Sequence, residues 1–140
     1  MSTLTTEQLT AGRRATSEVI AGLVNDGSAL PVARAAVKEA MARHLGVRFL
    51  QVVGPDLDAD ARAEADAATF QTALVALRGH PRLRCTFEVV SGSPAHKLVE
   101  RSRRAALLVV GEDQDGSGAS VAAYCRQHAA CTVQVVPSAP

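Results

Sequence analysis

The most chemically distinctive stretch of the chain is the loop GEDQDGSGAS, which runs from Gly111 to Ser120. It combines glycines, which let backbone amides approach a ligand, with the carboxylates of Glu112, Asp113 and Asp115. Backbone amides at the start of a helix bind anions such as phosphate, whereas carboxylates bind cations. Because the loop contains no Lys or Arg, we expect it to repel a polyphosphate unless a divalent cation such as Mg²⁺ lies between them.

Another acidic residue, Asp26, stands at a hinge near the start of the chain. It follows the apolar run 18–24 and precedes Gly27, Ser28 and a long alanine-rich segment. Two interpretations stay open for this hinge. Either Asp26 contacts a ligand, or the sequence NDGS is an ordinary turn in which Ser28 caps the following helix.

Short β-branched runs alternate along the chain with longer segments of helical period, which is typical of repeated strand-helix-strand units. The predicted strands are 18–24, 47–53, 84–90, 107–111 and 132–136, and the predicted helices are 29–45, 61–78, a third that begins with Ser93 and Pro94, and 121–129. We therefore predict an α/β fold, with a single-domain, open, doubly wound parallel sheet of five strands and helices on both faces. Ligands of such sheets bind beyond the carboxyl ends of the strands, where the strand order reverses.

The helical period also predicts which side chains face the sheet. For the first helix these are Val32, Ala36, Val37, Ala40 and Met41, with a stop at Gly46; for the second, Ala67, Phe70, Leu74 and Leu77, with a stop at Gly79; for the third, Ala95, Leu98, Val99 and Ser102; and for the fourth, Val121, Tyr124, Cys125, His128 and Ala129.

Composition narrows the class of protein. A chain of 140 residues with 47% hydrophobic residues is the size of one compact domain, and a net charge of +1 with 3% aromatic residues favours neither a nucleic acid nor a membrane as partner. We expect a polar N-terminal extension over 1–17 and a domain over 18–137. No stretch has the length of a membrane span or the apolar core of a signal peptide, and the cysteines, Cys85, Cys125 and Cys131, form no disulfide or zinc pattern, so we expect a cytoplasmic protein.

No catalytic or metal-binding constellation emerges from residue spacing. The four histidines are dispersed without metal-ligand spacing, and no serine-nucleophile, phosphate-loop or dinucleotide motif follows a predicted strand. We therefore expect no enzyme activity, no catalytic residue and no metal site.

Three segments, taken in order, carry a resemblance to a known family. They are VIAGLVNDGSALPVARAAVKEA near the start, VVSGSPAHKLVERS in the middle and LLVVGEDQDGSGASVAAYCRQHAACTVQVV at the end. Along roughly 18–137 the chain resembles a universal stress protein of the UspA type. The resemblance implies a flavodoxin-like sheet of order 3-2-1-4-5, homodimers formed through the last strand and, in many members, ATP bound where the strand order reverses.

The resemblance also implies which positions would bind a nucleotide, if one binds. They are Asp26, Gly27, Ser28, Val53, Gly92, Gly111, Gly116, Gly118, Ser120 and Val121. Members that bind ATP carry G-x2-G-x9-G-[ST] after the fourth strand, and this chain departs from that pattern. Gln114 stands in place of the second glycine. The nearest equivalent of the closing pair is Ala119 and Ser120, so the loop is about five residues short. Each position also has a structural interpretation, in which Val53 is core, the glycines serve turns and Ser120 caps a helix.

The last strand is an edge by the implied order, and an exposed edge of β-branched residues invites pairing with another chain. We predict a homodimer through Thr132, Val133, Gln134, Val135 and Val136, ended by Pro137, which lacks an amide proton.

Two functions stay open after this reading. The first is a non-catalytic, dimeric stress-response or regulatory module with a degenerate nucleotide site, which requires no cofactor and acts on an unidentified protein partner. The alternative is a switch that binds ATP or AMP, with Mg²⁺ and very slow ATP hydrolysis.

Overall fold

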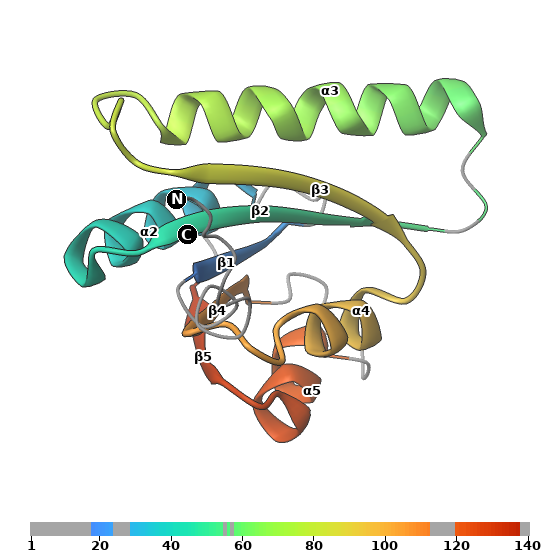
Figure 1. Cartoon of the computed structure of the whole chain (residues 1–140). Coiled ribbons are helices and arrows are strands. Elements are labelled where there is room, and N and C mark those ends of the chain that lie inside the picture. Colours follow the sequence, from blue (N-terminus) through green and yellow to red (C-terminus); the bar gives the residue numbers. More distant parts are fainter. Residues whose placement is uncertain (1–17, 24–28, 55, 57, 113–119, 138–140) are drawn as a thin grey trace, which may run out of the picture.

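The computed structural model describes residues 18–23, 29–54, 56, 58–112 and 120–137. Within them five parallel strands form one sheet of order β3-β2-β1-β4-β5, as predicted (Figure 1). The strands are β1 (Glu18–Leu23), β2 (Gly46–Val53), β3 (Cys85–Ser91), β4 (Leu107–Gly111) and β5 (Thr132–Val136), and the helices are α2 (Ala29–Arg43), α3 (Ala59–Ala76), α4 (Pro94–Arg101) and α5 (Val121–His128).

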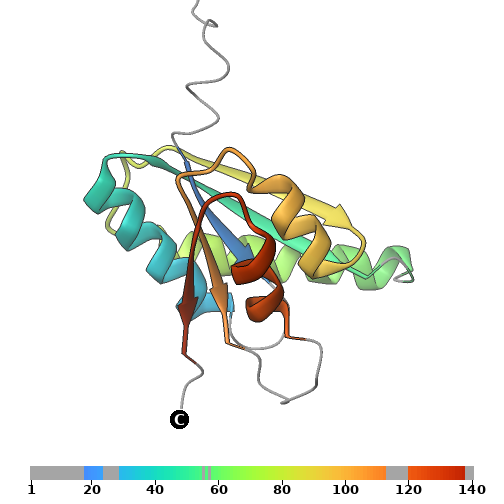
Figure 2. The ribbon, with the colours of Figure 1, turned by 90° about the horizontal axis from the view of Figure 1, so that it is seen from below.

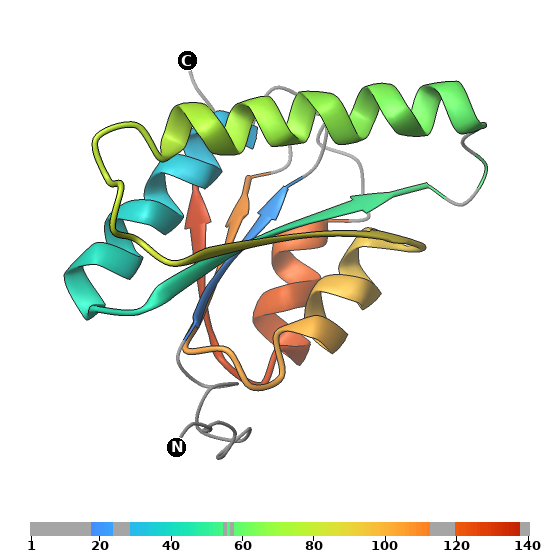
Figure 3. The same cartoon turned by 45° about the horizontal axis from the view of Figure 1, so that its top comes forward.

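Each face of the sheet carries its own apolar core, because successive strand residues point to opposite faces. Ala21, Phe49 and Val109 pack under α2 and α3, whereas Leu50 and Leu108 pack under α4 and α5. Figure 3 shows the sheet between these two helical layers, and Figure 2 views the molecule from the α4 and α5 side. The continuous apolar strands of the sequence therefore reflect a sheet that is covered on both faces.

The predicted stop of the first helix is wrong in detail. α2 ends at Arg43, and His44 takes the left-handed conformation with φ 58°, so that the Leu45 amide donates to the Ala40 carbonyl at 2.9 Å. Gly46 instead begins β2, where a β-carbon would lie 3.2 Å from the backbone oxygen of Arg84. The glycine serves the close approach of two chain segments rather than the helix end.

The predicted inward face of the second helix is wrong for Ala67, Phe70 and Leu74, whereas Leu77 packs against the core as expected. α3 buries a stripe of small side chains, Ala65, Thr69, Ala73 and Ala76, while the side chains of Phe70 and Leu74 are about half exposed. α3 lies along edge strand β3, and Phe70 reaches the ring of Phe87 on that strand at a centroid distance of 5.3 Å. Small residues allow the helix to approach the sheet closely, and the larger apolar ones extend over the edge.

The inward faces of the other helices are confirmed in part. Met41 of α2 and His128 of α5 were expected inside, yet both are exposed, and His128 stacks on Tyr124 at 4.3 Å between ring centroids. Leu98 and Ser102 at the third helix, like Cys125 of the fourth, are fully buried as expected. The last turn of α5 buries Cys125 and leaves His128 at the surface.

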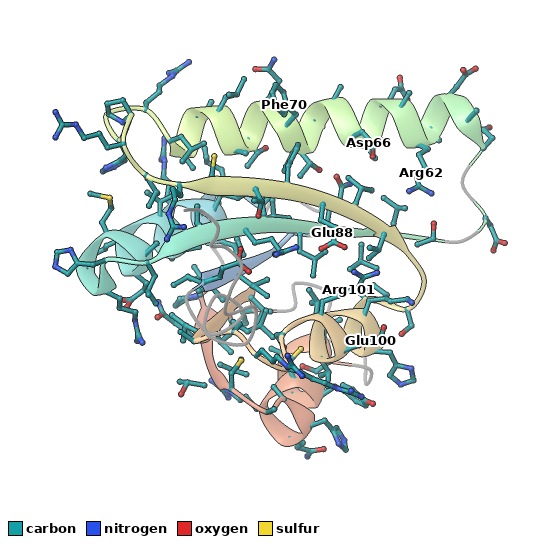
Figure 4. All side chains as sticks on the ribbon, in the orientation of Figure 1. Arg62, Asp66, Phe70, Glu88, Glu100 and Arg101 are labelled. Carbon is teal, nitrogen blue, oxygen red and sulfur yellow. The ribbon has the colours of Figure 1, made fainter. Side chains whose placement is uncertain are left out.

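A charged cluster occupies the part of the sheet that the short helix α4 leaves uncovered. The Arg48 guanidinium on β2 pairs with Glu18 at 3.0 Å and with Glu88 at 3.1 Å, and Arg101 at the end of α4 also donates to Glu88 (Figure 4). Burial opposes the charged form of Arg48, but the two carboxylates outweigh it and raise the pKa of this guanidinium. Glu18, Arg48 and Glu88 interrupt otherwise apolar strands, and the cluster gives each of these charges a partner of opposite sign.

Candidate functional site

The strand order reverses between β1 and β4, which places the predicted ligand crevice beyond the carboxyl ends of these two strands. β1 pairs with β2 on one side, with Leu23 opposite Gln51, and with β4 on the other, with Ala21 opposite Val109. Parallel pairing brings the ends of all the strands to one edge of the sheet, here called the carboxyl edge. The predicted site residues can be placed relative to this edge.

Val53 and Gly92 lie together at the β2 and β3 end of the carboxyl edge. Val53 is 4% exposed, and its carbonyl accepts a hydrogen bond from the Gly92 amide at 3.0 Å. Gly92 has φ 141°, and a β-carbon there would lie 2.8 Å from the Lys97 side chain. The structural interpretation thus accounts for both residues. Val53 belongs to the core, and Gly92 allows a backbone with positive φ and leaves space for the Lys97 side chain.

Gly111, Ser120 and Val121 lie at the β4 and α5 part of the same edge. The Ser120 hydroxyl accepts a hydrogen bond from the Ala123 amide at 3.0 Å, so it is the N-cap of α5. Because β3 and β4 are separated by two other strands, Gly92 and Gly111 lie about 14 Å apart along the edge. The sheet therefore does not gather all the predicted positions around one point.

The remaining predicted nucleotide positions, Asp26, Gly27, Ser28, Gly116 and Gly118, lie outside the described residues. The choice between ligand contact and turn for Asp26 therefore stays a prediction.

A buried amide at this edge escaped the sequence analysis. Gln51 on β2 is 1% exposed, and its Oε1 atom has no hydrogen-bond partner among the described residues. It faces α3, whose position over the sheet is fixed by Arg62 donating to Ser91 at 2.8 Å and by Phe70 against Phe87. The only available signal was a polar residue inside the apolar run VRFLQVV, which otherwise reads as a core strand.

A second unpaired acceptor lies on α3, one turn from Phe70. Asp66 points from the helix toward the sheet (Figure 4), and its Oδ1 atom is buried without a partner in the described part of the chain. A buried acceptor without a donor is costly, so the region between β2 and α3 is the place in the described structure that most needs an additional hydrogen-bond donor.

The charges along the carboxyl edge are mainly negative. The segment after β2 and the start of α3 carry Asp56, Asp58, Asp60 and Glu64, and Glu112 follows β4. Of the described cations at this edge, Arg62 donates to the Ser91 hydroxyl at 2.8 Å, and Lys97 pairs with Glu100 at 3.5 Å. The edge therefore offers a polyphosphate little compensating positive charge.

Metal-ligating and thiol side chains are dispersed over the described structure. Among the described residues no group of three or more His, Cys, Asp or Glu side chains could hold a metal ion. Cys125 is buried, Cys85 is exposed, and burial raises the pKa of the Cys131 thiol, which makes it a poor nucleophile. Over the same described ranges, none of the helices combines the length and apolar character of a membrane span.

The fold and the position of the crevice define the class of the protein as a flavodoxin-like, doubly wound α/β domain. No family model matches the chain. A universal stress protein of Mycobacterium tuberculosis strain H37Rv is 31% identical over 132 residues, which cover 87% of this chain and 49% of the relative. The chain thus spans about half the length of the curated relative that it matches.

Solved structures agree on the fold. A universal stress protein in complex with cAMP superposes with a TM-score of 0.68 at 22% identity and covers 89% of this chain and 98% of its own. One from Archaeoglobus fulgidus in complex with dAMP has a TM-score of 0.67 at 21% identity over 86% of this chain and 96% of its own. In sequence and in fold the chain is therefore similar to universal stress proteins of the UspA type.

Proposed function

We propose that the chain is a non-catalytic regulatory module of the universal stress protein family, which acts as a homodimer through protein contacts in the cytoplasm and holds no nucleoside triphosphate. The observation that carries this proposal is the charge of the carboxyl edge. Glu112, Asp113 and Asp115 follow β4 without any Lys or Arg up to Ser120, and further carboxylates follow β2. A triphosphate at this edge would meet like charge.

The described geometry is consistent with a decayed triphosphate site. The Ser120 hydroxyl caps α5 as an acceptor from the Ala123 amide and keeps its one O–H donor, which is a single neutral hydrogen bond for a phosphate. The positive end of the α5 dipole remains, but a single helix terminus contributes only about 0.3–1 kcal/mol at an exposed site. This is too little to offset several carboxylates around three phosphates.

A second candidate is a switch that binds a nucleoside monophosphate. Two structurally similar universal stress proteins were solved with cAMP and dAMP, which carry one phosphate each. In this chain the unpaired Oε1 of Gln51 lies two residues before the end of β2, and the exocyclic amine of an adenine would supply the missing donor once α3, which buries this atom, moved aside. A monophosphate also brings much less negative charge to the acidic edge.

The test of the charge argument is a variant that removes carboxylates from the loop. Asp113→Asn with Asp115→Asn is compared with the wild type and with Glu39→Gln, which removes one carboxylate on α2 away from the edge. Melting temperature is measured with ATP and with AMP, each with and without Mg²⁺. A ligand at about 100 times its Kd adds about 2.7 kcal/mol to stability, which is easily detected.

We expect ATP to leave the melting temperature of the wild type and of Glu39→Gln unchanged, and to raise that of the loop variant. A clear shift of the wild type with ATP would contradict the proposed decay of the triphosphate site. A shift with AMP alone would favour the monophosphate switch over the nucleotide-free module.

The proposed homodimer is supported by the free edge of β5. The Val136 carbonyl accepts from the Glu112 amide beside β4, so the backbone groups of Thr132, Gln134 and Val136 point toward β4. Those of Val133 and Val135 consequently point outward, where a second copy of the strand could pair with them.

A further inference from the structure

The end of the molecule opposite the carboxyl edge carries a basic groove between α2, α3 and the turn into β3. Figure 1 shows the C-terminal ends of both helices and this turn at the same end of the domain. Two hollows of about 480 Å³ and about 440 Å³ adjoin there and share Met41 and His80 in their walls. Together they form the surface that we call the basic groove.

Every charged side chain that lines the basic groove is a cation. The first hollow is lined by Arg34, Lys38 and Arg78, and the second by Arg82 and Arg84. Within the described part of the chain, none of these five side chains forms an ion pair. They make up a third of the fifteen Lys and Arg residues of a chain whose net charge is only +1.

Packing and helix dipoles do not explain all of this charge. Cations after the last turn of a helix are favourable, which accounts for Arg78. Arg34 and Lys38, however, lie four residues apart on α2, where two like charges destabilise a helix. A feature that costs stability and satisfies no internal partner is typical of a binding surface.

The floor of the basic groove is apolar. Met41 is 44% exposed, and the hollows are also lined by Val37, Val75, Leu45 and Leu83. Methionine adapts its shape to different partners and is frequent at protein-binding surfaces. No Phe, Tyr or Trp lines either hollow, and the rings in their walls are the imidazoles of His44 and His80, so the groove lacks the large stacking platforms typical of single-strand nucleic-acid sites.

We propose that the basic groove binds an acidic, partly apolar segment of a partner protein, with its carboxylates on the arginines and an apolar side chain against Met41. The rise of α2 between Arg34 and Arg43 is about 14 Å, which matches an amphipathic helix of about ten residues. The inference rests on the proposed regulatory function, because the basic groove would be the surface through which the module contacts its protein partner. It lies at the opposite end of the sheet from the nucleotide crevice.

The probe for the test is a fluorescein-labelled peptide of about ten residues in which pairs of Glu alternate with pairs of Leu, so that the Leu side chains form one helical face. Binding is followed by fluorescence anisotropy at low salt. A peptide with Gln in place of Glu tests the role of charge, and a labelled single-stranded oligonucleotide of equal length tests the other class of polyanion. The groove variants are Arg78→Gln with Arg82→Gln and Arg34→Gln with Lys38→Gln. Arg103→Gln with Arg126→Gln is the matched control on exposed sites elsewhere.

We expect each groove pair to weaken peptide binding about tenfold and the control pair to leave it unchanged. We also expect the Gln peptide to bind more weakly than the Glu peptide, and added salt to weaken the binding of the Glu peptide. The melting temperature of Arg34→Gln with Lys38→Gln should equal or exceed that of the wild type, since a repulsion is removed.

The proposal is overturned if the wild type does not bind the Glu peptide, if groove and control pairs lose affinity equally, or if the oligonucleotide binds the groove more tightly than the peptide. A large drop in melting temperature in both groove pairs would show that the cations are structural. Nucleotide titration of the same variants separates this proposal from the proposed function, because the groove pairs should leave any nucleotide signal unchanged.

Discussion

At the scale of single residues, Gly22 shows how closely the helices approach the sheet. A β-carbon there would lie 2.8 Å from one methyl group of Leu98 and 3.2 Å from Val110, and both neighbours are buried. We predict that Gly22→Ala lowers the free energy of unfolding by about 1–3 kcal/mol, because an overpacked core must shift backbone or rotamers. Gly54→Ala is the matched control, since nothing lies within 4 Å of its β-carbon position. Urea unfolding measures both, and an equal effect of the two substitutions would contradict the packing assignment.

The three thiols should differ in reactivity. Cys85 is exposed, whereas burial raises the pKa of Cys131, so that less of its thiolate is present at pH 8. We predict one fast thiol per chain with an aromatic disulfide reagent at pH 8, and its loss in Cys85→Ser. The slow reaction of Cys131 should accelerate as pH rises further. A fast phase that survives in Cys85→Ser would be inconsistent with this assignment.

The same pKa shift has a consequence for stability. The unfolded Cys131 thiol loses its proton near its ordinary pKa of about 8.5, while the folded one keeps it to higher pH. Between these values the unfolded state binds fewer protons, so the contribution of this residue to stability is complete below pH 8.5 and declines above it.

At the scale of elements, the cluster around Arg48 joins three strands and the end of α4. Removal of the guanidinium leaves the partly buried carboxylates of Glu18 and Glu88 facing each other. We predict that Arg48→Met costs about 1–2 kcal/mol at pH 7, while Arg103→Gln, on an exposed site, costs almost nothing. Denaturant unfolding of the wild type and the two variants checks this, and an equal cost for the two substitutions would exclude the electrostatic explanation.

The strands and the sheet order were predictable from the sequence because fully covered parallel strands have continuous apolar runs that end at turns. Strand ends fell within a residue or two of the prediction for the same reason. The face of α3 was not predictable from periodicity, since a helix over an edge strand packs through small residues and leaves Phe70 and Leu74 outside. The location of the candidate site, at the carboxyl edge, was predictable from the fold class. The unpaired amide of Gln51 was not, because its burial depends on α3 above it.

At the scale of the whole molecule, the proposed dimer depends on backbone groups of β5 rather than on one side chain. Val135 is predicted to direct its amide outward, so Val135→Pro should remove a ladder donor without breaking the pairing with β4. We predict a dimer mass for the wild type and for Val135→Ala by light scattering, and a monomer for Val135→Pro. A wild-type monomer, or a dimer that tolerates the proline, would rule out pairing through this edge.

Charge is distributed unequally over the domain, although the net charge is nearly zero. Carboxylates gather at the carboxyl edge, and cations gather in the basic groove at the other end. This distribution accounts for both proposals: the acidic end disfavours a triphosphate, and the basic end favours an acidic partner.

Calorimetric titration of the purified wild-type protein with ATP and with AMP, each with and without Mg²⁺, tests the central claim most directly. The account predicts no heat of binding with ATP under either condition, and retention of the fold is checked by circular dichroism. Micromolar binding of ATP that disappears in Asp26→Ala would contradict it, because Asp26 would then be a ligand residue of an intact nucleotide site.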